Sequence, residues 1–226
     1  MDARTYTNWH DQNRTWVPMS RKVTSLAAAS QKGSEKHLRS TARHKAQQGD
    51  YKSAIALLTQ LVERNPSAAN YNNRGLIYFQ SGQQALALED YNQALQIDPN
   101  FDSTYNNRAN CYISQGCIAE ALADYEVALN LNPGNVRSWI NQAITFREMG
   151  LYDLALENLD LALLLGGLEC HVYAERGRTY HLRGDWNCAI ADYQRAYDQL
   201  PETTAGIGLR QKISNWMNQL LSPATA

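Results

Sequence analysis

The sequence predicts an all-α protein built from repeated helix–turn–helix segments. The pentapeptide "YNNRG" begins at position 71, and "YNNRA" begins 34 residues later at position 105. The flanks match as well, because "LIYFQSGQQALALEDYNQALQIDP" aligns without a gap with "NCYISQGCIAEALADYEVALNLNP". A fixed period of this length is typical of arrays in which each repeat packs only on its neighbours.

Residues 1–33 precede the array. They are polar and basic, contain Trp9, Trp16 and Pro18, and show no sustained hydrophobic period. We interpret them as a flexible N-terminal arm. One alternative is an organellar targeting leader, although Asp2 and Asp11 are unusual in such leaders. Another is a docking segment that uses the two tryptophans.

Residues 34–203 are predicted to form five repeats of two helices each, at 35–67, 68–101, 102–135, 136–169 and 170–203. Glycine recurs where the first helix of each repeat ends, a position that favours the left-handed backbone conformation. These glycines are Gly49, Gly82, Gly116, Gly150 and Gly184. Proline stops the second helix in four repeats, at Pro66, Pro99, Pro133 and Pro201.

Small and large residues alternate at helical spacing within each repeat. Glycine or alanine stands where the two helices must approach closely, as at Gly75 and Gly177 in first helices and Ala87 and Ala121 in second helices. Aromatic residues fill the remaining space, as at Tyr91. Residues 204–220 do not form a sixth repeat. Their apolar residues recur at helical spacing, which predicts an amphipathic capping helix over the last repeat.

This pattern resembles the tetratricopeptide repeat (TPR), whose 34-residue signature runs aromatic, Gly/Ala, aromatic, Gly, Ala, aromatic, Ala, Pro. The repeats at 68, 102 and 170 match at almost every place, whereas those at 35 and 136 depart at several. The resemblance covers about three quarters of the chain. It implies a right-handed superhelix, or TPR solenoid, whose first helices line a concave groove that binds proteins.

Composition excludes several classes of protein. The net charge is −1, so no strong field for nucleic acid is expected. No apolar run reaches the roughly 20 residues of a transmembrane helix, and no signal-peptide core is present. The four cysteines form no CxxC pair, which favours reduced thiols, and we expect a cytoplasmic protein or, if residues 1–33 are a leader, an organellar one.

No enzymatic constellation is recognisable. His37 and His44, and likewise His171 and His181, lack metal-ligand partners at suitable spacing. No glycine-rich stretch has the strand-to-helix context of a nucleotide loop. We therefore predict neither an enzyme nor a cofactor or metal site.

Asparagine occupies the sixth place of three consecutive repeats, as Asn73, Asn107 and Asn141. An amide both donates and accepts hydrogen bonds, so it can pair with a peptide bond of any sequence. Stacked repeats lie on the order of 10 Å apart, about three residues of extended chain. These residues resemble the asparagine ladder in the repeat domain of O-GlcNAc transferase. The resemblance implies that they bind the backbone of an extended peptide, the alternative being a purely structural role.

Further polar residues fall at places that line the groove in this family: Asn110, Arg137, Arg39, Arg43 and Arg178. Arginines in a groove favour acidic or C-terminal groups of a peptide. The set that binds chaperone tails in this family is incomplete here, so we do not predict that ligand. Arg74, Arg108 and Arg176 recur beside the sixth place, and we expect them to pair with Asp90, Asp124 and Asp192.

The predicted function is protein binding, as a scaffold, adaptor or assembly factor that holds an extended partner segment or tail in the groove. Two alternatives stay open. Helical repeats of similar length also read single-stranded RNA, although residues 49–226 hold nineteen Asp/Glu against twelve Lys/Arg. The other alternative is a structural array that associates with itself through its end or through the tryptophan-bearing arm.

Overall fold

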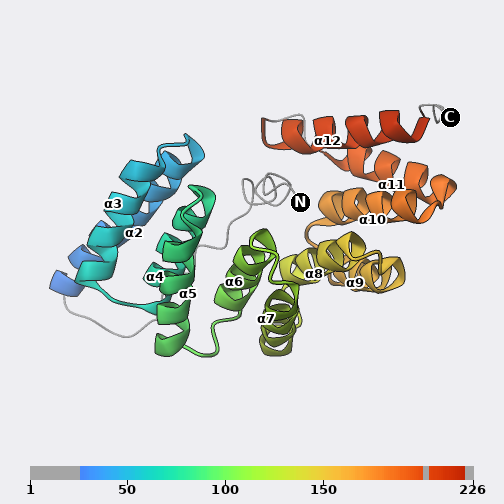
Figure 1. The fold of residues 1–226 in the computed structure, drawn as a ribbon. Helices are drawn as coiled ribbons and strands as arrows, with labels where there is room; N and C mark the ends of the chain where they lie inside the picture. The colour runs from blue at the N-terminus through green and yellow to red at the C-terminus, as the bar shows by residue number, and fades with distance from the viewer. Residues whose placement is uncertain (1–25, 201–203, 222–226) are drawn as a thin grey trace. The chain divides into compact units, whose positions relative to one another are not determined.

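A computed structural model describes residues 26–200 and 204–221 of the chain, and these are helical with no β-strand, which confirms the all-α fold (Figure 1). The predicted arm falls mainly on residues 1–25, which lie outside the described residues. Its C-terminal part differs from the prediction, because α2 already begins at Leu26, within the alanine-rich stretch "LAAAS". Alanine has the highest helix propensity, so the helix extends beyond the repeat period.

The helices alternate between first and second helices of the predicted repeats. The first helices are α2 (Leu26–Gln47), α4 (Ala68–Gln80), α6 (Asp102–Ser114), α8 (Val136–Glu148) and α10 (Glu169–Arg183). The second helices are α3 (Tyr51–Arg64), α5 (Gln84–Ile97), α7 (Ile118–Leu131), α9 (Tyr152–Leu165) and α11 (Trp186–Gln199). Helix α12 (Thr204–Leu221) occupies the residues predicted to cap the array.

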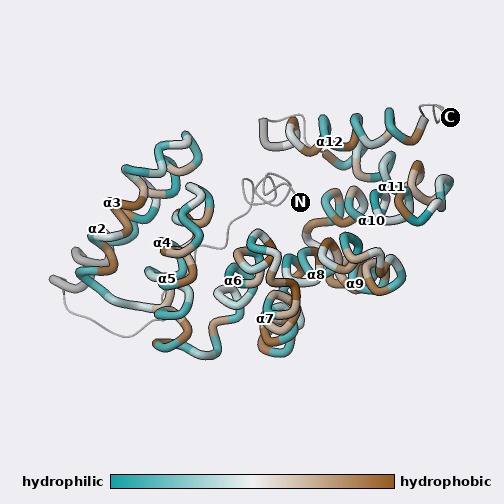
Figure 2. The backbone as a smooth tube through the Cα atoms, in the orientation of Figure 1, coloured by the Kyte–Doolittle hydropathy of each residue, from teal (hydrophilic) through white to brown (hydrophobic). Residues whose placement is uncertain are grey.

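The chain divides into two compact units between Asp124 and Tyr125, within α7. The N-terminal unit contains α2 to α6 and the start of α7, and the C-terminal unit contains the rest of α7 and α8 to α12. Apolar and polar stretches alternate along α3, α7 and α9, as expected of helices with one buried face (Figure 2). Within each unit, the two helices of a repeat pack as an antiparallel pair.

Glycine has the predicted conformational role at the turns. Gly82 has φ of 81° and Gly184 has φ of 97°, and the other three turn glycines are also left-handed. Glycine also has the predicted packing role inside helices. A Cβ atom on Gly75 would lie 2.9 Å from Tyr91 Cε1 and 3.2 Å from the carbonyl oxygen of Ala87. The backbones of α4 and α5 can therefore approach only without a side chain at this position.

Arginine–aspartate pairs join the two helices of three repeats, which confirms the predicted pairing. Arg74 Nη2 donates to Asp90 Oδ1 over 2.7 Å, and Arg74 Nε donates to Asp90 Oδ2 over 2.8 Å. The same two-pronged arrangement joins Arg108 to Asp124 and Arg176 to Asp192. The hydrogen bond to Asp90 raises the pKa of Arg74, while burial raises the pKa of Asp90.

The repeat at 136–169 replaces this charged pair by a neutral one. Asn158 Nδ2 donates to Gln142 Oε1 over 2.8 Å at the equivalent positions. In the charged repeats the arginine also reaches the second helix of the preceding repeat, as Arg176 Nη1 does when it donates to Asp160 Oδ1 over 2.6 Å. The arginine therefore stabilises both its own helix pair and the stacking of neighbours.

Helix α12 covers the last repeat with an apolar face. Ile213 is fully buried and Leu209 nearly so, in one cluster with Ala189 and Tyr193 of α11. The indole of Trp216 stacks on the Tyr193 ring with a centroid distance of 5.9 Å and an interplanar angle of 29°. The apolar core of the C-terminal unit thus extends into α12.

Candidate peptide-binding face

In the N-terminal unit, two of the predicted ladder asparagines lie on neighbouring first helices. Asn73 of α4 is 1% exposed, and its Nδ2 has no acceptor among the residues that the structure describes. Asn107 of α6 is half-buried, and its Nδ2 donates to Asn72 Oδ1 over 2.9 Å. The second asparagine thus bridges α4 and α6, whereas the first retains an unsatisfied donor.

The remaining predicted residues of this unit differ in their surroundings. Asn110 of α6 is buried, with 2% of its surface exposed. Arg39 of α2 donates to Asn70 Oδ1 over 3.2 Å and to Glu35 Oε2 over 3.3 Å. Its guanidinium is therefore already paired with a carboxylate of its own helix. Arg43 is exposed. Asn73 therefore lies on α4 and Asn107 and Asn110 lie on α6, which packs against α4, whereas Arg39 has a structural partner.

In the C-terminal unit, Asn141 and Arg137 lie one turn apart on α8. Asn141 is 7% exposed, and its carbonyl oxygen accepts from Thr145 Oγ1 over 3.0 Å. Arg137 is half-buried, and burial lowers the pKa of its guanidinium. It makes no hydrogen bond or ion pair with another described residue. Arg137 is therefore a partly desolvated cation, and no carboxylate of the described residues forms an ion pair with it.

Arg178 of α10 faces α12 instead of standing free. Its Nη1 donates to Gln219 Oε1 over 3.1 Å, and its guanidinium lies 5.5 Å from the Trp216 ring centroid. The same nitrogen lies 3.3 Å from His181 Nδ1. Burial and the charge of Arg178 lower the pKa of His181. Arg178 therefore helps to hold α12 in place.

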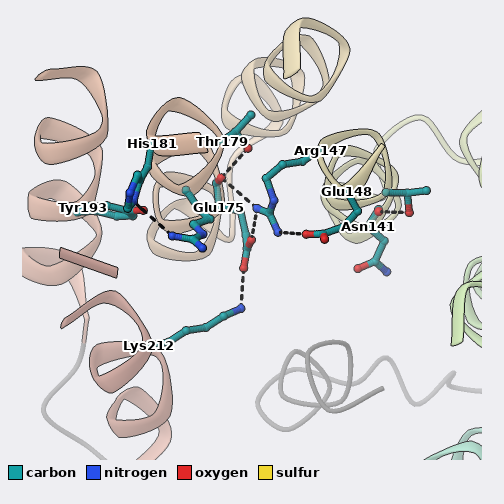
Figure 3. Close-up of polar contacts among 10 residues, drawn as sticks. Asn141, Arg147, Glu148, Glu175, Thr179, His181, Tyr193 and Lys212 are labelled. Carbon is teal, nitrogen blue, oxygen red and sulfur yellow. Dashed lines mark hydrogen bonds and ion pairs between the residues drawn. The ribbon is translucent and has the colours of Figure 1, made fainter. Parts of the chain in front are cut away.

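A chain of ion pairs links α8, α10 and α12 in the C-terminal unit (Figure 3). Glu175 of α10 is fully buried, and its carboxylate lies between two cations. Arg147 Nη1 of α8 donates to Glu175 Oε2 over 2.6 Å, and Lys212 Nζ of α12 donates to Glu175 Oε1 over 3.0 Å. Arg147 Nη2 also contacts Glu148 Oε1 at 3.4 Å. One carboxylate thus connects three helices.

The sequence interpretation did not find this chain. Glu175 stands at the sixth place of its repeat, where the preceding three repeats carry asparagine. This replacement of an amide by a carboxylate was the one sign in the sequence that Glu175 has a different partner. No other repeat carries arginine at the place of Arg147, and Lys212 lies beyond the five repeats, so periodicity did not indicate their contact with Glu175.

Cys111 is buried, and burial raises the pKa of its thiol to about 11. All four cysteines are free. Among the described residues no three His, Cys, Asp or Glu side chains lie close enough to hold a metal ion. None of the described helices is long and apolar enough to cross a membrane.

Three family models match the chain, and all three describe tetratricopeptide repeats. They cover residues 42–68, 75–116 and 103–135. These stretches coincide with the helix pairs and turns described above. The chain is a tetratricopeptide repeat protein. No curated protein sequence matches it.

Solved structures of other TPR proteins share the fold. A thermophilic TPR protein of Thermus thermophilus is 19% identical, with a TM-score of 0.72 over 81% of this chain and 98% of that one. PilF of Pseudomonas aeruginosa is 19% identical, with a TM-score of 0.66 over 84% and 92% of the two chains. A TPR protein of Parabacteroides merdae is 20% identical, with a TM-score of 0.59 over 83% and 75%.

The TPR fold supports a general role as a protein-interaction scaffold, and TPR proteins are generally not catalytic. In this TPR protein Asn73, Asn107 and Asn110 lie on first helices of the N-terminal unit, and Asn141 and Arg137 lie on a first helix of the C-terminal unit.

Proposed function

We propose that this TPR protein is an adaptor or assembly factor that holds an extended segment of a partner protein along its first helices. The observation that carries the proposal is the amide of Asn73, whose buried Nδ2 lacks an acceptor in the described chain. An unsatisfied buried donor costs about 1 to 3 kcal/mol. A carbonyl oxygen of a bound peptide would offset this cost if binding displaces the side chains that cover this nitrogen.

The neighbouring repeats offer groups of the same kind. Asn107 donates to Asn72 but keeps its Oδ1, for which the described chain supplies no donor, as an acceptor for a peptide N–H. Asn141 stands at the equivalent place in α8 of the C-terminal unit. Because an amide can donate to and accept from the peptide groups of any sequence, such a series can recognise an extended backbone whatever its side chains are.

The asparagines test this proposal directly. We expect Asn73→Ala, Asn107→Ala and Asn141→Ala together to reduce capture of the partner from a native lysate by an immobilised full-length chain. A neutral hydrogen bond contributes about 0.5 to 1.5 kcal/mol, so the triple variant should weaken binding by roughly 2 to 4 kcal/mol, allowing for non-additivity. Its melting temperature should change little, because alanine has a higher helix propensity than asparagine.

A matched control replaces exposed asparagines on second helices, Asn130→Ala and Asn187→Ala. This variant should capture the partner as the parent does. If the triple variant binds normally, the first helices do not form the site. If it unfolds, the asparagines are structural, and Asn107 is the one whose inter-helix bond explains the loss.

The free thiols are compatible with a reducing compartment, and we propose that the protein acts in the cytoplasm. The acidic balance of residues 49–226 favours a protein partner over RNA.

A further inference from the structure

One ring nitrogen of His181 lies where two side chains that hold α12 meet. Its Nδ1 is 3.3 Å from Arg178 Nη1 and 3.3 Å from the hydroxyl oxygen of Tyr193 (Figure 3). A guanidinium has N–H donors and no acceptor, so Nδ1 accepts a hydrogen bond from Arg178 and carries no proton. The contact therefore requires a neutral imidazole, with its proton on Nε2.

Both neighbours of this nitrogen contact Trp216 of α12. The guanidinium of Arg178 lies 5.5 Å from the centroid of the Trp216 ring, and Arg178 Nη1 also donates to Gln219 Oε1 over 3.1 Å. The Tyr193 ring of α11 stacks on the same indole at a centroid distance of 5.9 Å. The protonation state of one imidazole is therefore coupled to α12 through two side chains.

Protonation of Nδ1 removes this acceptor and places a second positive charge beside the guanidinium. The new N–H would point at an N–H of Arg178, and like charges at this distance repel each other. Burial and the charge of Arg178 already lower the pKa of His181 in the folded protein. Once His181 is charged, Arg178 moves away from it, and the contacts of Arg178 with Gln219 and Trp216 are strained.

The groups that face His181 do not balance this charge. They are Arg178 on its own helix and Tyr193 on α11, whose pKa is raised by burial so that its hydroxyl stays neutral. Helix α12 contains two cations, Arg210 and Lys212, and no acidic residue. No carboxylate of the described residues forms an ion pair with His181. On the other helices packed against α10, several carboxylates are paired with arginine instead: Glu148 on α8, Asp153 and Asp160 on α9, and Asp192 on α11.

We propose that His181 is a pH-sensitive switch whose protonation weakens the docking of α12 on α10 and α11. A histidine ordinarily titrates near pH 6.5. Because folding lowers the pKa of His181, docking should be unaffected above about pH 7 and should weaken progressively as the pH falls below about 6.5. Release of α12 would expose apolar side chains of α11, including Ala189 and Tyr193. The inference does not rest on the proposed function, because no asparagine of the first helices takes part in it.

Hydrogen–deuterium exchange of the full-length chain tests the proposal. The protection of α12 is measured relative to that of α3 in the other unit, at about pH 7.5 and about pH 5.5, and corrected for the intrinsic pH dependence of exchange. A histidine with an ordinary pKa in the undocked state changes the docking equilibrium by at most about tenfold over this range. The relative protection of α12 should therefore fall several-fold at the lower pH.

Two asparagine variants separate His181 from other titrating groups. His181→Asn keeps an acceptor near the position of Nδ1 but does not titrate, so α12 should be equally protected at both pH values. His44→Asn, which removes an exposed histidine of α2 in the other unit, should respond as the parent does. The proposal is wrong if the parent loses no protection in α12, if the loss persists in His181→Asn, or if it disappears in His44→Asn.

An NMR titration of the parent covers the case in which His181→Asn does not fold. The indole N–H signal of Trp216 should shift with the same midpoint as the ring signals of His181. Arg178→Gln should raise this midpoint, because the neighbouring cation is removed. A Trp216 signal that does not follow the titration of His181, or a midpoint that Arg178→Gln leaves unchanged, would overturn the proposal.

Discussion

Replacing Glu175 by glutamine should destabilise the C-terminal unit more than any other single change of charge. The carboxylate is fully buried between Arg147, which is 6% exposed, and Lys212. Glutamine keeps the shape but removes the negative charge, so the buried Arg147 retains only its longer contact of 3.4 Å with the partly exposed Glu148. Removing one partner of a buried ion pair typically costs about 3 to 5 kcal/mol.

Urea unfolding provides the measurement. A domain of about 100 residues has an m value of roughly 1 to 3 kcal/mol per molar urea, so the unfolding midpoint should fall by about 1 M or more. Because repeat arrays can unfold in stages, the stacked Tyr193 and Trp216 rings should be followed as a local fluorescence probe of this unit.

Glu148→Gln is the matched control for this prediction. Its carboxylate is 40% exposed and lies 3.4 Å from Arg147, so the change should cost no more than about 1 kcal/mol. Similar midpoints for the two variants would refute the argument that burial makes the Glu175 pair important. Lys212→Met should have an intermediate effect, because Glu175 retains Arg147.

Two further predictions concern helix packing and the arginine–aspartate pairs. Gly177→Ala should lower stability by about 1 to 3 kcal/mol, because the new Cβ would lie 2.8 Å from Tyr193 Cδ1, whereas Gly208→Ala has open space and should raise stability by up to about 1 kcal/mol. An equal response of the melting temperature to both would show that the helix pairs do not pack as described. Gln142→Arg combined with Asn158→Asp should restore the charged pair of the other repeats and raise the free energy of unfolding by about 1 to 3 kcal/mol, the value for a charge-assisted pair, which urea unfolding would measure. A less stable double variant would mean that the neutral pair is required by its surroundings.

Recurrent residues made most of the fold predictable. Gly82 and Gly184 were recognised because one backbone conformation recurs at every turn. The pairing of Arg74 with Asp90 was predicted because both residues return with the period, as side chains that contact each other in every repeat must.

Contacts that occur once were not predictable in this way. The bond from Asn107 to Asn72 joins the sixth place of one repeat to the fifth of the preceding one, so its direction depends on rotamers that the period does not determine. Lys212 meets Glu175 only because α12 follows the last repeat, and the bond from Arg147 to Glu175 has no counterpart in the other repeats, so an internal comparison of repeats does not predict either contact. Arg39 and Arg137 both stand at places that line the groove in this family, and only the structure shows that the first is paired and the second is not.

The lysine that reaches Glu175 also limits how this array can be lengthened by recombination. Lys212 lies 37 residues after Glu175, on the helix that begins where a further repeat would begin. A repeat grafted in place of α12 must therefore carry a cation at the position of Lys212 in its first helix. Otherwise Glu175 must be replaced by asparagine, the residue found at its place in the three preceding repeats. Duplication of one of the three central repeats meets neither condition, since Leu76, Asn110 and Ile144 stand at the corresponding places, whereas the first and last repeats carry Arg43 and Arg178 there. The final helix and the buried acid therefore have to be exchanged together when a copy of a central repeat is added.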